Sequence, residues 1–149
     1  MISLFKKMVF AISIALYSSV LFADQFYASK GVAIEGYDTV AYFTQNTAVK
    51  GLHKYSTVWD GITWYFSNEK HLTLFTASPE KYIPQFGGYC ALGAAHNGAV
   101  PSDPQTFTIH KEKLYFNMSP PVATTWRLNP DFHIERATKA WQNKEIVFY

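Results

Sequence analysis

The sequence contains a single cysteine, Cys90, among its 149 residues. One thiol cannot form an internal disulfide, so the fold must be stabilised by its core. The paired spacings that mark strong zinc sites, such as CxxC or HxxxH, are absent from the sequence as well. It also has no phosphate-binding glycine loop, dinucleotide fingerprint or serine-histidine-aspartate order, so no motif indicates an enzyme class.

Beyond its first 23 residues, the chain has no excess of positive or negative charge. The whole sequence has 13 Lys and Arg against 11 Asp and Glu, and Lys6 and Lys7 lie in the first 23 residues. The remaining residues therefore carry 11 basic and 11 acidic side chains, scattered without runs. This balance leaves no basic field, and we expect no nucleic-acid partner.

Apolar runs long enough to span a membrane are also lacking. The stretch MVFAISIAL (8–16) is shorter than the ~20 residues that a spanning helix needs. It follows Lys6 and Lys7 and precedes a more polar segment that ends at Ala23, an order typical of a secretory signal peptide. We therefore predict a signal peptide over residues 1–23, an exported protein, periplasmic or secreted, and no stable membrane span after cleavage.

No repeat of fixed period, low-complexity tract or long linker is evident in the sequence. Hydrophobic residues make up 48% of the chain, which is ample for a core. These features predict one compact domain over residues 30–145.

Aromatic residues are abundant, at 17% of the chain, and their alternation predicts a first hairpin. Asp60-Gly61 favours a tight turn within residues 54–66, because both positions of a type I′ turn need positive φ. The β-branched and aromatic content of residues 37–43 favours a further strand, so we expect antiparallel strands over about 37–66. The expected cross-strand pairs are Trp59 with Ile62, Thr57 with Trp64 and Tyr55 with Phe66.

A second hairpin is predicted over residues 105–117. Its expected cross-strand pairs are Phe107 with Phe116 and Ile109 with Leu114. The turn pair Lys111-Glu112 is poor for a tight turn, so we expect a longer or irregular loop.

Helical patterns follow each hairpin. Residues 67–82 change to helical spacing, with Ser67 or Asn68 as the cap and Pro79 opening a second short helix. Pro120 and Pro130 also look like first helical positions. A final amphipathic helix is marked by Ile134, Ala137 and Trp141. The sequence therefore predicts a small α+β domain in which hairpins pack against short helices and a C-terminal amphipathic helix.

Five segments of the chain carry a family resemblance. They are GYDTVAYF (36–43), VKG (49–51), SPEKYIPQFGGYCALG (78–93), DPQTFTIH (103–110) and KLYFN (113–117). In this order they resemble the exported, stand-alone YHS domain proteins of bacteria. The resemblance implies a metal-binding role, because YHS domains are similar to modules of metal-transporting ATPases in which cysteines are ligands. Such modules carry a cysteine just after the hairpin, where this chain has Ser67.

Cys90 lies in the glycine-rich segment GGYCALGAAHNG (87–98). At the start of a short helix its thiol would feel backbone amides that favour the thiolate, which suits a nucleophile or a soft-metal ligand. The alternative is a buried cysteine that acts as a small apolar residue, since free cysteine is among the most buried residue types.

His96 follows six residues after Cys90, and a bend at Gly93 would bring the two side chains together. A cysteine-histidine pair suits copper or zinc. We therefore predict a ligand-binding site of Tyr89, Cys90 and His96, and metal ligands drawn from Cys90, His96, His71 and His53.

Asp38 and His71 are expected to play lesser parts. Asp38 could accept backbone hydrogen bonds and so anchor a loop. His71 lies one position from the apolar face of its helix, which favours a boundary or solvent position for its ring.

The leading functional prediction is an exported YHS-type binding module for a metal ion or small ligand, without catalytic activity. One alternative is a thiol-dependent redox protein or enzyme with Cys90 as the nucleophile. The other is a protein-protein interaction module that docks a partner through an aromatic surface.

Overall fold

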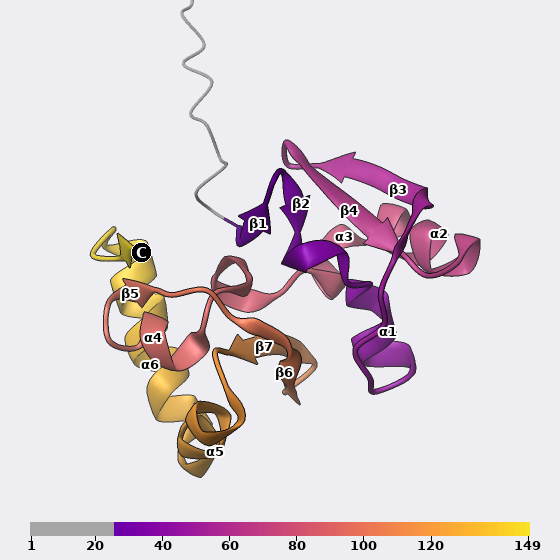
Figure 1. Cartoon of the computed structure of the whole chain (residues 1–149). Coiled ribbons are helices and arrows are strands. Elements are labelled where there is room, and N and C mark those ends of the chain that lie inside the picture. The colour runs from indigo at the N-terminus through magenta and orange to yellow at the C-terminus, as the bar shows by residue number, and fades with distance from the viewer. Residues whose placement is uncertain (1–25) are drawn as a thin grey trace, which may run out of the picture.

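The computed structural model describes residues 26–149, which form a small α+β domain (Figure 1). The predicted signal peptide lies outside the described residues. Among residues 26–149, no helix is both long and apolar enough to cross a bilayer.

The first half of the described chain combines a four-stranded sheet with short helices. The strands follow the order β1-β2-β4-β3, with β3 and β4 antiparallel and β2 parallel to β4. The elements are β1 (Ala28–Ser29), β2 (Val32–Ala33), the 3-10 turn η2 (Ile34–Gly36), α1 (Thr39–Thr44), β3 (Leu52–Trp59), β4 (Ile62–Phe66), α2 (Glu69–Ala77) and α3 (Pro79–Tyr82).

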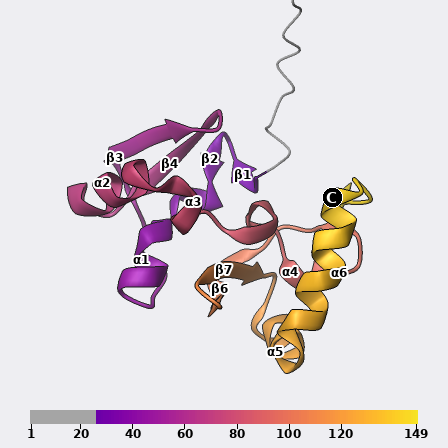
Figure 2. The ribbon, with the colours of Figure 1, turned by 180° about the vertical axis from the view of Figure 1, so that it is seen from behind.

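The second half contains a hairpin and the longest helix of the described chain. Seen from behind, α6 runs along this half beside α4 (Figure 2). The elements are the 3-10 turn η3 (Gln85–Gly88), α4 (Ala91–Ala94), β5 (Gly98–Ala99), β6 (Asp103–His110), β7 (Lys113–Asn117), α5 (Pro120–Leu128), α6 (Pro130–Gln142) and β8 (Val147–Phe148).

The strand predicted over residues 37–43 is wrong, because this segment forms α1. Asp38 caps the helix, and its Oδ1 accepts hydrogen bonds from the amides of Val40 and Ala41. Residues 39–42 are buried on all sides, so the helix is held by tertiary packing. This packing overrides the strand preference of its β-branched and aromatic residues.

The first hairpin has the predicted turn and most of the predicted register. Asp60 and Gly61 have φ values of 51° and 75°, as a type I′ turn requires, and the two pairs next to the turn are confirmed. The third expected pair is wrong. A bulge between Leu52 and Ser56 places Leu52, and not Tyr55, opposite Phe66.

The second hairpin has both predicted pairs, but its turn is tighter than expected. Lys111 and Glu112 have φ values of 48° and 59°, so two side-chain-bearing residues adopt the left-handed conformation of a two-residue turn. The longer loop predicted here is therefore wrong. This conformation costs a non-glycine residue about 1–2 kcal/mol.

The predicted helix starts after the hairpins are confirmed. Asn68 caps α2, and its side chain accepts a hydrogen bond from the His71 amide. Pro79, Pro120 and Pro130 each occupy the first position of a helix.

The two halves of the chain are copies of one structural unit, contrary to the expectation that no repeat is present. Each unit runs from a 3-10 turn through a short helix, an 8-residue strand and a 5-residue strand to a 9-residue helix and a proline-led helix. The offset is 51 positions, from 52 to 103, from 62 to 113 and from 69 to 120. We refer to residues 32–82 as the first repeat and residues 84–142 as the second repeat.

Backbone geometry matches closely between the repeats. The residue before each proline-led helix has nearly the same conformation, with φ and ψ of −153° and 70° at Ser78 and −151° and 70° at Asn129. Both hairpins carry a bulge at the same place. Three successive residues with positive φ precede the first helix in each repeat, at 34–36 and at 86–88.

Aromatic packing matches as well. The ring of Trp64 lies 5.2 Å from that of Phe75, and the equivalent rings of Tyr115 and Trp126 lie 5.0 Å apart. Each pair joins the second strand of a hairpin to the following helix. The repeats therefore share their local core design as well as their backbone.

The repeats pack together through one shared core. The ring of Tyr42 in α1 contacts Phe107 and Phe116 of the second repeat, at centroid distances of 4.7 and 5.2 Å. Its hydroxyl donates a hydrogen bond of 2.9 Å to the carbonyl of Pro104. Burial raises the pKa of Tyr42 far above its ordinary value, so the phenol stays neutral.

Candidate functional site

Cys90 is a buried free cysteine that caps α4, with only 1% of its surface exposed. Its Sγ accepts a hydrogen bond from the Gly93 amide at 3.5 Å and donates to Asn117 Oδ1 at 3.6 Å. A buried thiol is shielded from solvent, substrates and oxidants. The structure therefore favours the interpretation of Cys90 as a small packed residue.

The other residues predicted around Cys90 lie in different surroundings. His96 is exposed after α4, and its charge, together with Arg136, adds to burial in lowering the pKa of His133 on α6. Tyr89 is half-buried among the rings of Tyr27 and Trp141, with Phe148 beside them. The ligand-binding site predicted from Tyr89, Cys90 and His96 stays a prediction.

His53 and His71 lie in the first repeat, on β3 and on α2. His53 is exposed on β3, and its ring lies 5.6 Å from that of Tyr65. His71 is 5% exposed, so its expected boundary or solvent position is wrong. Across the described residues, no group of three or more His, Cys, Asp or Glu side chains could hold a metal ion.

His71 is buried because it pairs with Asp38. The imidazole Nδ1 lies 2.6 Å from Asp38 Oδ2, and the same oxygen accepts hydrogen bonds from the amide and hydroxyl of Ser67. With the two helix amides of α1, the Asp38 carboxylate accepts five hydrogen bonds. Asp38 therefore anchors more than the loop expected from sequence, since it joins α1 to the start of α2.

On the side away from Asp38, the His71 ring contacts the hydroxyl of Thr44. His71 Nε2 lies 3.2 Å from Thr44 Oγ1, giving a carboxylate-imidazole-hydroxyl order. Thr44 is exposed, but it is the last residue of α1 and its hydroxyl donates to the Val40 carbonyl. The C-terminal end of a helix presents partial negative charge, which opposes a developing oxyanion. We therefore assign the network a structural role.

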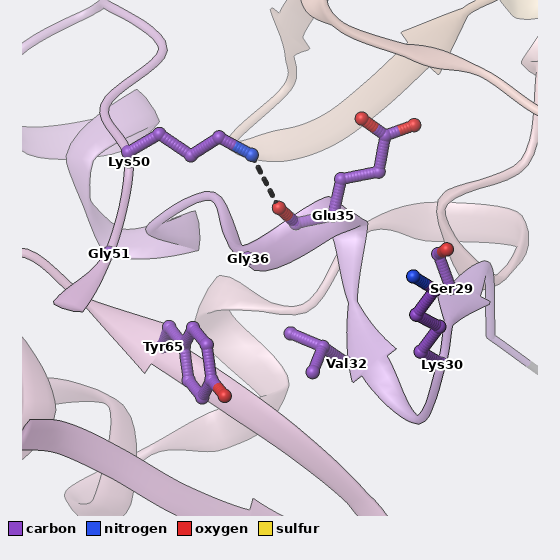
Figure 3. Close-up of a pocket in the computed structure, with 8 residues that line it drawn as sticks. All are labelled: Ser29, Lys30, Val32, Glu35, Gly36, Lys50, Gly51 and Tyr65. Carbon is purple, nitrogen blue, oxygen red and sulfur yellow. Dashed lines mark hydrogen bonds between the residues drawn. The ribbon is translucent and has the colours of Figure 1, made fainter. Parts of the chain in front are cut away.

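A cavity of about 450 Å³ lies in the first repeat, beside the sheet (Figure 3). The side chains of Val32 and Tyr65 face one another in it, and Lys50 reaches across its rim to the carbonyl of Glu35 at 2.6 Å. The lining residues are Ser29, Lys30, Val32, Glu35, Gly36, Lys50, Gly51 and Tyr65. We refer to this space as the sheet cavity.

Strained backbone lies in and next to the wall of the sheet cavity, since Glu35 lines the cavity and Ile34 precedes it. Ile34 and Glu35 have φ values of 47° and 52°, and a β-branched residue such as Ile34 is a genuine outlier in this region. Gly36 and Gly51 allow close approach to Tyr65, since a Cβ on Gly51 would lie 2.5 Å from the Tyr65 backbone. Strain of this kind is retained where the surrounding structure over-determines it, which is common at ligand sites.

The sheet cavity carries a net positive charge. Lys30 and Lys50 supply two ammonium groups against the single carboxylate of Glu35. That carboxylate extends away from Tyr65 and accepts a hydrogen bond of 2.7 Å from the Tyr27 hydroxyl. Burial and this carboxylate raise the pKa of Tyr27 to about 12, so its hydroxyl remains a donor at neutral pH. The arrangement suits an anion.

Sequence reasoning did not place a site in the sheet cavity. The segments GYDTVAYF and VKG contain Gly36, Lys50 and Gly51, but they contributed only to the family resemblance. These segments alone could not reveal the cavity, because the ring that lines it, Tyr65, belongs to neither segment and only the fold brings it to Lys50 and Gly51.

Exposed apolar side chains occur at several places in the described chain. Met118, Leu128 and Phe132 lie on or beside α5 and α6, and Val147, Phe148 and Tyr149 lie in β8 and at the residue after it. These residues are exposed apolar side chains of the kind that a partner-docking surface needs. The docking surface itself stays a prediction.

Comparisons with protein-family models, with curated proteins and with solved structures gave no match to this chain. The resemblance to YHS domain proteins therefore stays a prediction.

Proposed function

We propose that the protein is an exported binding module, of the kind that the YHS resemblance implies, and that it holds a small organic anion in the sheet cavity. The observation that carries this proposal is the lining of that cavity, which joins an aromatic ring to two ammonium groups. Its volume of about 450 Å³ falls in the range of roughly 300–1,000 Å³ typical of small-molecule sites.

The ligand we propose is a planar aromatic carboxylate. The Tyr65 ring and the Val32 methyl groups offer apolar surface to a ring, since aromatic pairs gain from offset or edge contacts. Lys50 donates to the Glu35 carbonyl, and its ammonium nitrogen lies 4.1 Å from the centroid of the Tyr37 ring. An ammonium group has three donors, so a donor remains for a carboxylate. We propose this small-ligand form of the function over the copper or zinc form because the cavity lining fits an organic anion.

Calorimetric titration of the purified protein with benzoate tests the proposal. We expect a dissociation constant below about 1 mM, and no comparable binding of benzylamine, which carries the same ring with the opposite charge. Lys50→Met should weaken benzoate binding about tenfold, because it removes the charge and keeps the length of the side chain.

Lys54→Met is the matched control, because Lys54 is an exposed lysine of β3 outside the cavity lining. It should bind benzoate as the wild type does. Equal binding of benzoate and benzylamine, or unchanged binding by Lys50→Met, would contradict the proposal.

A further inference from the structure

A second cavity, of about 580 Å³, lies between the two repeats. We refer to it as the inter-repeat cavity. Its lining comes from α1 and α3 on one side and from the β6–β7 turn on the other, and ligand sites occur preferentially at such interfaces. The lining residues are Phe43, Glu80, Lys81, Ile83, Gln85, Ile109, Lys111, Glu112 and Lys113.

The strained turn of the second hairpin forms one rim of this cavity. The equivalent turn of the first repeat is Asp60-Gly61, which adopts the same conformation with favoured residues. The fold therefore admits a favourable pair at this position, and the second repeat instead carries Lys111-Glu112. The backbone conformation of the turn does not require Lys111 and Glu112, since Asp60-Gly61 adopts it at lower cost. A role for the two side chains at the cavity rim explains why they are present.

The turn is fixed in place from outside the cavity. Lys111 Nζ lies 2.9 Å from both carboxylate oxygens of Asp131, and His110 Nε2 lies 2.8 Å from one of them. The Lys111 ammonium group is therefore paired with a carboxylate of α6. The neighbouring Glu112 and Lys113 form no ion pair with any residue of the described chain.

Side chains of opposite charge from both repeats line the cavity together with apolar side chains. Glu80 and Lys81 come from α3, and Glu112 and Lys113 come from the turn. The apolar part of the lining, which we call the apolar floor, consists of the half-buried side chains of Phe43, Ile83 and Ile109. Each wall therefore offers both an anion and a cation beside apolar surface.

We infer that the inter-repeat cavity binds a zwitterion with an apolar side chain, the chemistry shared by apolar α-amino acids and short apolar peptides. The ammonium and carboxylate of such a ligand complement the paired charges of the two walls, and its side chain covers the apolar floor. This site is separate from the sheet cavity, since the two share no lining residue.

Titration with leucine and leucyl-leucine, followed by amide NMR, tests this inference. We expect saturable shifts at Ile109 and Lys113, with a dissociation constant below about 1 mM for at least one of the two ligands. Isoamylamine and 4-methylpentanoate, which each lack one charge of leucine, should bind at least about tenfold more weakly. Failure of both zwitterions to shift these residues, or equal binding of the singly charged analogues, would overturn the inference.

The single substitution Glu112→Gly separates binding from folding, because it leaves the Lys111–Asp131 ion pair in place. We expect the melting temperature to rise by about 3 °C or more, because glycine removes the strain at this position of the turn, while zwitterion binding weakens at least about fivefold. Lys144→Gly is the control, because Lys144 also has positive φ, at 56°, and lies outside the cavity lining. It should leave binding unchanged.

Two results of this experiment would count against the inference. One is a more stable variant that binds the zwitterion as the wild type does, and the other is a variant with no gain in stability. Lys50→Met should bind leucine normally, so loss of the benzoate site and loss of this site are distinguishable.

Discussion

The two repeats cap their first helices with chemically different residues at equivalent positions. Asp38 and Cys90 both follow a run of positive φ and a Gly-Tyr pair, and both accept a hydrogen bond from an amide three residues ahead. Asp38 accepts five hydrogen bonds, whereas the Cys90 thiol makes only two long contacts to nitrogen and oxygen.

This difference explains the lone cysteine. One backbone geometry is held in the first repeat by a buried charge and its donors, and in the second repeat by a small apolar residue with a weak acceptor. The partner of each cap differs in the same way. The buried His71 of the first repeat is replaced by the apolar Val122 at the equivalent position of the second repeat. Cys90 is therefore best understood as the apolar counterpart of Asp38 in the second repeat.

The largest expected effect comes from breaking the ionic cap of the first repeat. Asp38→Ala leaves His71 and the Ser67 amide buried without their acceptor, and we expect a loss of about 3–5 kcal/mol in the free energy of unfolding. Cys90→Ala should cost only about 1 kcal/mol, because it removes weak sulfur contacts. Urea unfolding measures both, and equal losses would show that the caps do not differ as described.

Gly51 and Ser102 provide the next contrast. A Cβ on Gly51 would meet the Tyr65 backbone at 2.5 Å, whereas Ser102 carries a side chain at the equivalent position and donates to the Gly88 carbonyl at 2.6 Å. Gly51→Ala should destabilise the protein by about 1–3 kcal/mol through overpacking. Ser102→Gly should cost about 1 kcal/mol through the lost hydrogen bond. Denaturant midpoints of the two variants test this order.

A smaller effect is expected at the hairpin turn of the first repeat. Replacing Asp60-Gly61 with Lys-Glu gives the first hairpin the turn of the second, and should lower stability by about 1–2 kcal/mol. The turn glycine has φ of 75° and no neighbouring atom within 4 Å of an added Cβ, so the loss is due to backbone strain alone. A melting temperature unchanged from the wild type would indicate that the second turn is not strained.

The smallest effect concerns pH. His133 takes the place of Tyr82 in the second repeat, and burial, with smaller contributions from His96 and Arg136, lowers its pKa below 6.5. The unfolded chain therefore binds this proton more readily, so stability present above pH 6.5 is lost as the pH falls. His133→Phe should reduce the drop in melting temperature between pH 8 and pH 5. An unchanged drop would assign the acid sensitivity to other groups.

Local patterns in the sequence predicted much of the fold. Asp60-Gly61 and the prolines at 79, 120 and 130 act through their own backbone preferences, so the turn and helix starts they predict are present. The α1 helix was missed because its burial, and not its propensity, determines its conformation. The tight Lys111-Glu112 turn was missed because neither residue favours it.

The repeat escaped sequence analysis because the two copies share almost no identical residues. Between residues 52–82 and 103–133, identity is confined to Thr57 with Thr108, Thr73 with Thr124 and Pro79 with Pro130. What is preserved is size and packing, as between Phe75 and Trp126. The Asp38–His71 pair and both cavities were missed for a related reason, since they join residues that only the tertiary fold brings together.

The most direct test of the central claim, that the sheet cavity and not the Cys90 segment binds ligand, is an amide NMR titration of the wild-type protein with benzoate. We expect saturable shifts at Gly36, Gly51 and Tyr65, with Cys90 and Gly93 unmoved. Shifts centred on Cys90 and Gly93, with Gly51 and Tyr65 unmoved, would contradict it.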